Sequence, residues 1–462
     1  MTLIKSISGI RGTIGGVTSE NLTPLDIVKF TTAYSRFIKQ STTSDEVTVV
    51  VGRDARVSGE MVNSIIEGTL LGCGVNVINL GMCTTPGTEM AVVHYKAQGG
   101  IIITASHNPK QWNALKLLNA QGEFLSDAEG KQIQAFAEDE EYLYPGVDAL
   151  GRVVERVDYN PLHIAEVLAL PEVDVEAVKA RKFRVAVDAV NSIGGVVIPD
   201  LLRQMGCEVI EINCEPTGLF AHNPEPLKEN LTQISELIKE QGADLGVVVD
   251  PDVDRLALVC EDGEMFGEEY TLVAVADYIL SRTKGSTVSN LSSSRALKDV
   301  TEAHGCSYSA AAVGEVNVVA KMKETGAVIG GEGNGGVIFP ELHYGRDSLV
   351  GVALFLTYFA AKGCTMSELR ASYPAYFASK NKAELEVGMD VDGMLNTIKQ
   401  RHASETVTDI DGVKIDFAES WAHLRKSNTE PIVRIYTEAK SQSEADALAE
   451  KFIAEMNEIC RG

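Results

Sequence analysis

The chain has 462 residues, 23% of them charged and 45% hydrophobic, which is typical of a globular protein with several domains. It carries 65 acidic and 41 basic residues, and the net charge of −24 argues against a nucleic-acid partner, which requires a basic face. No apolar run reaches the roughly 18 residues of a membrane span, and the first residues lack the features of a secretion signal. We therefore expect a cytoplasmic protein with no membrane partner.

The cysteines point in the same direction. There are eight of them, none forms a CxxC pair, and most lie beside glycine or apolar residues. This pattern favours reduced thiols in the protein core over disulfides or a metal site.

The hydrophobic pattern indicates a threefold internal repeat. Apolar strands are expected at 47–51, 183–187 and 287–291. Each leads into a polar loop, a helical stretch and a Gly-Cys turn, which is the order of a βαβ unit in a parallel sheet. Chance recurrence of Gly-Cys turns is the alternative explanation.

Each repeat then reaches a second buried strand that leads into a polar loop. These strands, each with its candidate loop residue, are 100–103 with Ser106, 245–249 with Asp250, and 327–329 with Glu332. Open α/β sheets bind ligands beyond the carboxyl ends of their strands. The loops of the repeats are therefore candidates for one shared cleft.

The pattern changes after about Tyr373. Residues 432–438 alternate between apolar and polar, as in a half-exposed antiparallel strand, and 443–459 form an amphipathic helical pattern. We predict an α/β fold in which three similar mixed-sheet domains built on βαβ units and a smaller C-terminal α+β domain surround a central cleft. The expected domains are 1–153, 154–259, 260–370 and 371–462.

Ser106 is the candidate nucleophile. It lies in the sequence Thr-Ala-Ser-His-Asn-Pro, where an apolar strand gives way to an Asn-Pro turn that presents its side chains. A serine hydroxyl is a weak nucleophile that needs a nearby base, a metal or a stored phosphoryl group. His107 is a supporting residue, although its place in the sequence does not make it face the serine. A plain turn serine is the alternative.

Asp250, Asp252 and Asp254 alternate, so in an extended segment their carboxylates project in one direction. Hard oxygen ligands of this kind suit Mg²⁺ or Ca²⁺. An EF-hand is disfavoured because Arg255 stands where that loop needs glycine, and because strands flank the segment. Arg255 would add positive charge next to a phosphoryl group. A solvated acidic turn is the alternative.

Two further loops offer polar ligand groups. Glu332 and Asn334 lie among glycines, which let the backbone approach a ligand closely, and their polar groups suit sugar hydroxyls. The second loop offers phosphate ligands, namely Arg425, Ser427, Asn428 and Thr429. A plain glycine-rich turn and a capped surface turn are the respective alternatives.

These motifs, in this order, resemble the α-D-phosphohexomutase superfamily of phosphoglucomutases, phosphomannomutases and phosphoglucosamine mutases. The resemblance implies that Ser106 is phosphorylated in the resting enzyme and holds Mg²⁺ together with the three aspartates. It assigns sugar contacts to the Glu332 loop and the non-reacting phosphate to the Arg425 loop. The four domains then correspond to phosphoserine, metal-binding, sugar-recognition and phosphate-binding domains.

Proton transfer at the serine oxygen has two candidates. Lys116 follows Ser106 in the same region, and Arg11 lies in a segment similar to the family's N-terminal motif. Some family members carry histidines at the positions of Glu315 and Gly336, so a histidine-based mechanism is disfavoured here.

The resemblance predicts an isomerase that passes phosphate from Ser106 to a sugar monophosphate through a hexose 1,6-bisphosphate, which is both intermediate and activator. The glycine-rich loop at 331–336 looks most like that of phosphoglucosamine mutases, which favours glucosamine 6-phosphate and glucosamine 1-phosphate. Glucose and mannose phosphates are the alternative substrates, and a phosphatase or a non-catalytic sugar-phosphate sensor stays open. We expect a small-molecule phosphosugar as partner and a monomer or homodimer.

Overall fold

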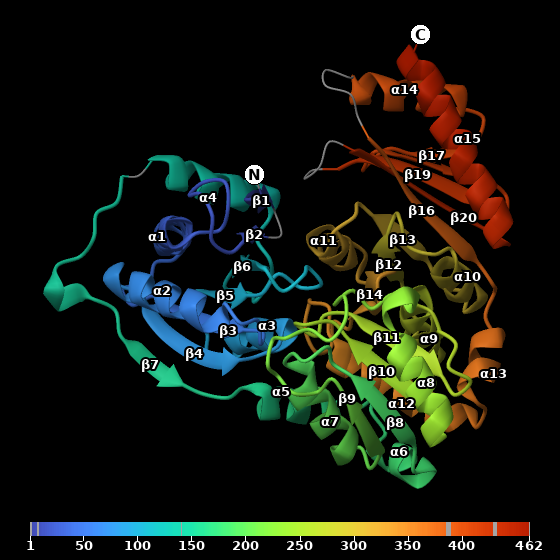
Figure 1. The fold of residues 1–462 in the computed structure, drawn as a ribbon, viewed down its shortest axis with the longest axis horizontal. Coiled ribbons are helices and arrows are strands. Elements are labelled where there is room, and N and C mark those ends of the chain that lie inside the picture. Colours follow the sequence, from blue (N-terminus) through green and yellow to red (C-terminus); the bar gives the residue numbers. More distant parts are fainter. Residues whose placement is uncertain (1, 7–8, 140, 385–389, 428–431, 462) are drawn as a thin grey trace. The chain divides into compact units, whose positions relative to one another are not determined.

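A computed structural model describes residues 2–6, 9–139, 141–384, 390–427 and 432–461, with side chains through 459 (Figure 1). The chain divides into two compact units, which we call the first and second unit and describe separately. The first unit comprises Met1–Thr271 and Gly335–Ser367, and the second comprises Leu272–Asn334 and Glu368–Gly462. Within the described part, no helix is both long and apolar enough to cross a membrane.

The first unit begins with a mixed sheet in the order β1-β2-β6-β5-β3-β4-β7. Strands β4, β3 and β5 are parallel, and β6 runs antiparallel to β5 and β2. Side chains of β3 alternate between the two faces: Val49 and Val51 pack with α1, α2 and α4, and Val50 packs with α3. The elements are β1 (Ile4–Ser6), β2 (Gly9–Thr13), α1 (Pro24–Gln40), β3 (Thr48–Arg53), α2 (Gly59–Gly72), β4 (Asn76–Met82), α3 (Thr85–His94), β5 (Gly99–Ile103), β6 (Trp112–Leu118), α4 (Asp127–Asp139), the 3₁₀ turn η1 (Val147–Ala149) and β7 (Val153–Arg156).

A second sheet of the first unit has the order β11-β10-β8-β9, with only β11 antiparallel to its neighbour. Helix α8 covers one face, where Ile234 and Ile238 pack against Ala186 and Val248. The elements are α5 (Asn160–Leu168), α6 (Val175–Arg181), β8 (Arg184–Asp188), α7 (Gly194–Gln204), β9 (Glu208–Ile212), η2 (Lys228–Asn230), α8 (Thr232–Gln241), β10 (Leu245–Val249), β11 (Leu256–Cys260), β15 (Gly336–Ile338) and α12 (Ser348–Lys362).

The second unit contains the parallel strands β13-β12-β14 and an antiparallel sheet in the order β16-β20-β19-β18-β17. Helices α14 and α15 pack on one face of the antiparallel sheet through an apolar core that includes Ile398 and Phe452 (Figure 1). The elements are β12 (Thr287–Asn290), α10 (Ala296–Ala303), β13 (Tyr308–Ala311), α11 (Glu315–Thr325), β14 (Ile329–Glu332), β16 (Phe377–Glu384), α14 (Val391–Arg401), β17 (Thr406–Thr408), β18 (Val413–Asp416), β19 (Trp421–Lys426), β20 (Ile432–Ala439) and α15 (Gln442–Arg461), with α9 (Glu268–Arg282) and α13 (Met366–Ala371) at the unit boundaries.

The predicted α/β fold and its repeat are confirmed. The strand triplets β4-β3-β5, β9-β8-β10 and β13-β12-β14 each place the first strand of the repeat between the next two. One strand lies later in the chain than expected. Strand β14 runs from Ile329 to Glu332, whereas the sequence predicted 327–329. Glycine has low strand propensity, but Gly330 pairs with Val288, and a Cβ at Gly330 would approach the sulfur of Met322 to 2.5 Å. Close packing here overrides the local preference.

Candidate active site

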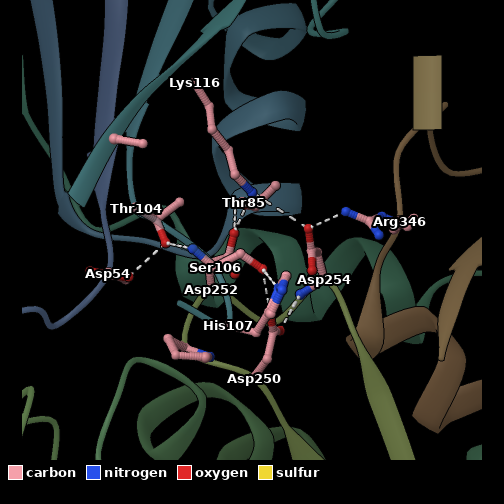
Figure 2. A network of polar contacts seen from close by, with 12 residues as sticks. Asp54, Thr85, Thr104, Ser106, His107, Lys116, Asp250, Asp252, Asp254 and Arg346 are labelled. Carbon is pink, nitrogen blue, oxygen red and sulfur yellow. Dashed lines mark hydrogen bonds and ion pairs between the residues drawn. The ribbon is translucent and has the colours of Figure 1, made fainter. Parts of the chain in front are cut away.

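Ser106 lies just beyond the end of β5 in a strained conformation. Its φ of 48° falls in the left-handed region, which non-glycine residues rarely adopt. Its amide donates to Thr104 Oγ1 at 3.0 Å, and the Thr104 hydroxyl donates to Asp54 Oδ2 at 2.6 Å (Figure 2). These bonds compensate for the backbone strain and fix where the hydroxyl points.

A buried arginine holds the rest of this loop. The Nε of Arg56 donates to Asp54 Oδ2 at 3.0 Å, and its terminal nitrogens donate to the carbonyls of Ser106, Asn108 (2.7 Å), Pro109 (2.8 Å) and Trp112 (3.0 Å). The Arg56 side chain is fully buried. One guanidinium therefore fastens the whole turn from Ser106 to the start of β6, which its fork of donors suits.

The three aspartates follow β10 and lie together. Ligand oxygens of Asp250, Asp252 and Asp254 are all within 4.8 Å of one another, and the three side chains are buried (Figure 2). Val253 between them has a φ of 65°, which is strained for a β-branched residue. The amides of Asp254 and Arg255 both donate to Asp250 Oδ1 at 3.2 Å, so the backbone wraps around this carboxylate.

Ser106 contacts an aspartate directly, and His107 lies beside Ser106. The Ser106 hydroxyl donates to Asp250 Oδ2 at 2.8 Å, and His107 Nδ1 lies 3.4 Å from the serine oxygen. The charge of Arg255, followed by burial and Arg11, holds the pKa of His107 well below its usual value. The imidazole is therefore neutral near pH 7 and has no spare proton to donate as an imidazolium.

Lys116 reaches the same aspartates from β6. Its Nζ lies 2.6 Å from Asp252 Oδ2 and 3.5 Å from Asp254 Oδ2. Burial alone would lower the pKa of Lys116, but the two carboxylates outweigh it and raise the pKa, so the amine is protonated. Because Arg11 on β2 pairs with Ala114, two residues before Lys116, Arg11 and Lys116 lie on the same face of the sheet.

Arg11 belongs to the same charged neighbourhood. Burial and the nearby charge of Arg255 lower the pKa of Arg11, while Asp252 acts in the opposite direction. The structure thus brings together all the predicted site residues of the first unit, namely Arg11, Ser106, His107, Lys116, Asp250, Asp252, Asp254 and Arg255.

No pattern in the sequence indicates two further contacts of the aspartates. Thr85, at the start of α3, donates its hydroxyl to Asp252 Oδ2 at 2.6 Å and its amide to the Asp252 carbonyl at 2.9 Å. Arg346, which precedes α12, donates to Asp254 Oδ2 at 2.7 Å. The Thr-Thr-Pro start of α3 is a recognisable helix cap, but no local pattern indicates its partner.

The aspartate cluster fits a hard divalent cation. Asp252 Oδ1 and Asp254 Oδ1 are buried and have no hydrogen-bond partner among the described residues. Burial and the charges of its two neighbours raise the pKa of Asp250 well above its ordinary value. A dication would offset this repulsion and bind the orphaned oxygens, so the donor set suits Mg²⁺, with the oxygen of Ser106 next to it.

In the second unit, Glu332 ends β14 with a buried side chain. Its Oε1 accepts from Asn290 Nδ2 at 2.8 Å and from the amide of Gly314 at 3.1 Å. Asn334, two residues on, is half-buried. Glu332 is thus held rigidly at the carboxyl end of its strand, as the repeat predicted.

Arg425 lies near the end of β19, where its Nε is 3.3 Å from Asp411 Oδ2. Ser427 is buried, and its amide donates to the carbonyl of Ile432 at 3.0 Å. The predicted phosphate ligands Asn428 and Thr429 lie outside the described residues. Asp411, which sequence reasoning missed, is the polar neighbour of the arginine.

Comparison with known proteins adds a family assignment. Sequence models of the phosphoglucomutase/phosphomannomutase family match the chain in four segments. Alpha/beta/alpha domains I, II and III match residues 4–143, 161–263 and 267–376, and the C-terminal domain matches 376–455.

Named relatives extend over nearly the whole chain. A "phosphoglucomutase/phosphomannomutase" of Thermococcus kodakarensis is 36% identical over 456 residues, covering 98% of this chain and 99% of the relative. A "phosphoglucosamine/phosphogalactosamine mutase" of Sulfurisphaera tokodaii is 31% identical over 456 residues, covering 97% and 98%. The solved structure of a putative phosphomannomutase from Thermus thermophilus is 27% identical with a TM-score of 0.82, covering 100% of both chains. The chain therefore belongs to the phosphoglucomutase/phosphomannomutase family and is an isomerase that acts as a phosphohexomutase.

Proposed function

We propose that this phosphohexomutase interconverts glucosamine 6-phosphate and glucosamine 1-phosphate through a phosphorylated Ser106 and a hexose 1,6-bisphosphate. One observation carries the chemistry: the Ser106 oxygen lies 2.8 Å from Asp250 inside a buried cluster of carboxylates and cations. A phosphoryl group on this oxygen would be held between positive charges in a site with little water, where electrostatic stabilisation is strong.

The proposed transfer balances over two half-reactions. A hydroxyl oxygen of the sugar monophosphate attacks the phosphorus on Ser106, and the bond between phosphorus and the serine oxygen breaks. The sugar hydroxyl loses its proton to solvent, and the serine oxygen gains one from Lys116, which its aspartate neighbours keep protonated. In the second half-reaction the Ser106 hydroxyl attacks the other phosphorus of the bisphosphate and returns its proton to Lys116, while the bond from that phosphorus to the sugar oxygen breaks and this oxygen takes up a proton from solvent.

Asp250, Asp252, Asp254 and Ser106 would hold Mg²⁺. When bound, this ion supplies positive charge to the phosphoryl oxygens. Arg255 stays within the cluster, with its Nε 3.9 Å from Asp254 Oδ1, and would add a second positive charge for the transferred group.

We assign recognition of the rest of the substrate to the second unit. Glu332 and Asn334 would contact the sugar, and Arg425 with Ser427 would bind the phosphate that does not react. The side chain of Glu332, which is only 4% exposed, favours glucosamine as the sugar, because its buried carboxylate would pair with the ammonium that glucosamine carries at C2. The relative in Sulfurisphaera tokodaii, named for amino-sugar phosphates, supports the same choice.

Glucose and mannose phosphates form the second candidate pair. The observation in their favour is the 36% identical relative from Thermococcus kodakarensis, which is named for glucose and mannose phosphates. The chemistry at Ser106 would be the same, because the sugars differ at C2 and not at the reacting oxygens.

The test is to measure kcat/KM for glucosamine 6-phosphate, glucose 1-phosphate and mannose 1-phosphate with Mg²⁺ and a trace of the matching bisphosphate. We expect a preference of at least about tenfold for the amino sugar, equivalent to about 1.4 kcal/mol in transition-state binding. A preference for glucose or mannose would contradict the substrate assignment. Release of inorganic phosphate without isomerisation would indicate a phosphatase, and tight binding without turnover a sensor.

A further inference from the structure

We propose that Asp411 is a positioning residue that orients Arg425 for phosphate binding and links it to the Glu332 loop. The inference rests on the proposed role of Arg425 as a phosphate ligand. All residues involved lie in the second unit, on the loop between β17 and β18, on β19, and around the start of α11.

The loop that carries Asp411 lies against β19. Gly412 has a φ of 68°, and a Cβ there would come within 2.2 Å of the Leu424 carbonyl and 2.8 Å of the Arg425 Cα. Only glycine allows this approach. The close backbone contact brings the Asp411 carboxylate alongside Arg425, with 3.3 Å between Oδ2 and Nε.

The contact leaves the phosphate-binding end of the arginine available. The closest approach of Asp411 is to Nε, as an ion pair at 3.3 Å without hydrogen-bond geometry, and not to the two terminal nitrogens. A guanidinium binds phosphate oxygens most effectively through a pair of parallel donors. Fixing one edge of the group by a carboxylate reduces the side-chain entropy that is lost when phosphate binds.

The same carboxylate reaches the sugar loop through two consecutive amides. The amide of Val313 donates to Asp411 Oδ2 at 3.0 Å, and the next amide, that of Gly314, donates to Glu332 Oε1 at 3.1 Å. Gly314 has a φ of 114°, a conformation that favours glycine. A shift of Asp411 therefore moves the backbone that supports Glu332.

The main chain of the loop has a separate anchor. The Asp411 carbonyl accepts from His423 Nε2 at 2.7 Å, and His423 Nδ1 in turn accepts from the Ser292 hydroxyl at 2.9 Å. These bonds do not involve the Asp411 side chain. A change confined to the carboxylate should therefore leave the loop in place.

The experiment compares Asp411→Asn with Asp409→Asn in the full-length enzyme, with the sugar phosphate that the wild type uses best. The asparagine oxygen still accepts from Val313 but no longer pairs electrostatically with Arg425. We expect KM to rise about tenfold with kcat within about twofold. Asp409 is a matched control on the same loop, with a side chain 54% exposed and paired only with Lys399 among the described residues, and its variant should keep wild-type kinetics.

A double-mutant cycle separates this inference from the function on which it rests. Arg425→Ala should raise KM, and adding Asp411→Asn to it should raise KM no further. An equal increase in both backgrounds, or a wild-type KM for Asp411→Asn alone, would overturn the positioning role. A wild-type KM for Arg425→Ala would instead overturn the assignment of Arg425 to phosphate.

The link to Glu332 has its own readout. Asp411→Ala, which also removes the acceptor of the Val313 amide, should change the ratio of kcat/KM for glucose 1-phosphate and mannose 1-phosphate by about threefold or more, because the backbone under Glu332 relaxes. Asp409→Ala should leave the ratio unchanged. An unchanged ratio in Asp411→Ala would show that Asp411 acts on Arg425 alone and would overturn the coupling.

Discussion

The proposed reacting group and the proposed phosphate ligand are held in different ways. In the first unit, Ser106 and the aspartates are buried, and Lys116 lies 2.6 Å from Asp252. In the second unit, the side chains of Arg425 and Asp411 are 17% and 22% exposed. The groups proposed for the chemistry are held in place without substrate, whereas the proposed phosphate ligand keeps contact with solvent. Changes in the first region should therefore act mainly on kcat and changes in the second mainly on KM.

The largest loss of kcat is expected from Ser106→Ala in the first unit. Without an oxygen to carry the phosphoryl group, kcat should fall on the order of 10⁴-fold or more in a coupled mutase assay. Ser19→Ala is a matched control, because Ser19 also has a left-handed φ, of 67°, but is exposed. Residual activity above a tenth of wild type in Ser106→Ala would rule out the serine as phosphate carrier.

Asp252→Asn should produce the next largest loss. This carboxylate contacts both Lys116 and Thr85 and contributes an orphaned oxygen to the proposed cation site. We expect kcat to fall about 10²–10³-fold and the Mg²⁺ concentration for half-maximal activity to rise about 10–100-fold. Titration of activity with Mg²⁺ after chelator treatment measures both. Asp262→Asn, in an exposed turn, should behave as wild type, and an unaltered Mg²⁺ requirement in Asp252→Asn would argue against the site.

Arg56→Lys tests whether the serine loop must be held rigidly. Lysine keeps the charge beside Asp54 but cannot reach the carbonyls of Ser106 and its neighbours with several donors at once. We expect kcat to fall about 10–100-fold with little change in KM, as for a small misplacement of a reacting group. Arg36→Lys on the surface serves as control. A rise in KM at constant kcat would place Arg56 among the recognition groups instead.

The smallest effect concerns a buried histidine in the second unit. Burial lowers the pKa of His423 to about 4 in the folded chain, below its ordinary value of 6.5. Between these values the unfolded chain binds the extra proton, so stability should fall as the pH drops from about 6.5 to 4, by at most about 3 kcal/mol.

Urea unfolding across this pH range, with wild type and His423→Gln, measures the dependence. The glutamine variant should lose stability less steeply, because its side chain does not titrate. Parallel pH profiles for the two proteins would show that His423 is not the group responsible.

The sequence predicted the parts of the site whose signals are local. Strands β5 and β10 are apolar runs, and Ser106 and Asp250 follow them within a few residues. The sequence therefore predicted both the strand and the side chain at its end. The repeat predicted that such loops share the carboxyl ends of equivalent strands. The resemblance to the phosphohexomutase superfamily then predicted phosphoryl transfer at these residues.

Contacts between distant segments could not be predicted in this way. Arg56 lies 50 positions from Ser106, and Thr85 lies 167 positions from Asp252. Neither residue stands in a motif, and only the packing of α3 and the closure of the serine loop bring the partners together. Asp411 could not be predicted for the same reason. Its proposed role depends on a glycine turn that approaches β19 and on an amide 98 positions away.

The most direct test of the account is to quantify phosphate on Ser106 by peptide mass spectrometry. Wild-type protein and Ser106→Ala would be incubated with glucose 1,6-bisphosphate and Mg²⁺ and then chased with sugar monophosphate. We predict one phosphate on Ser106 of the wild type, none on the corresponding peptide of the variant, and loss of the serine phosphate during the chase with matching formation of bisphosphate. Turnover at normal rates without any phosphate on Ser106 would contradict the central claim.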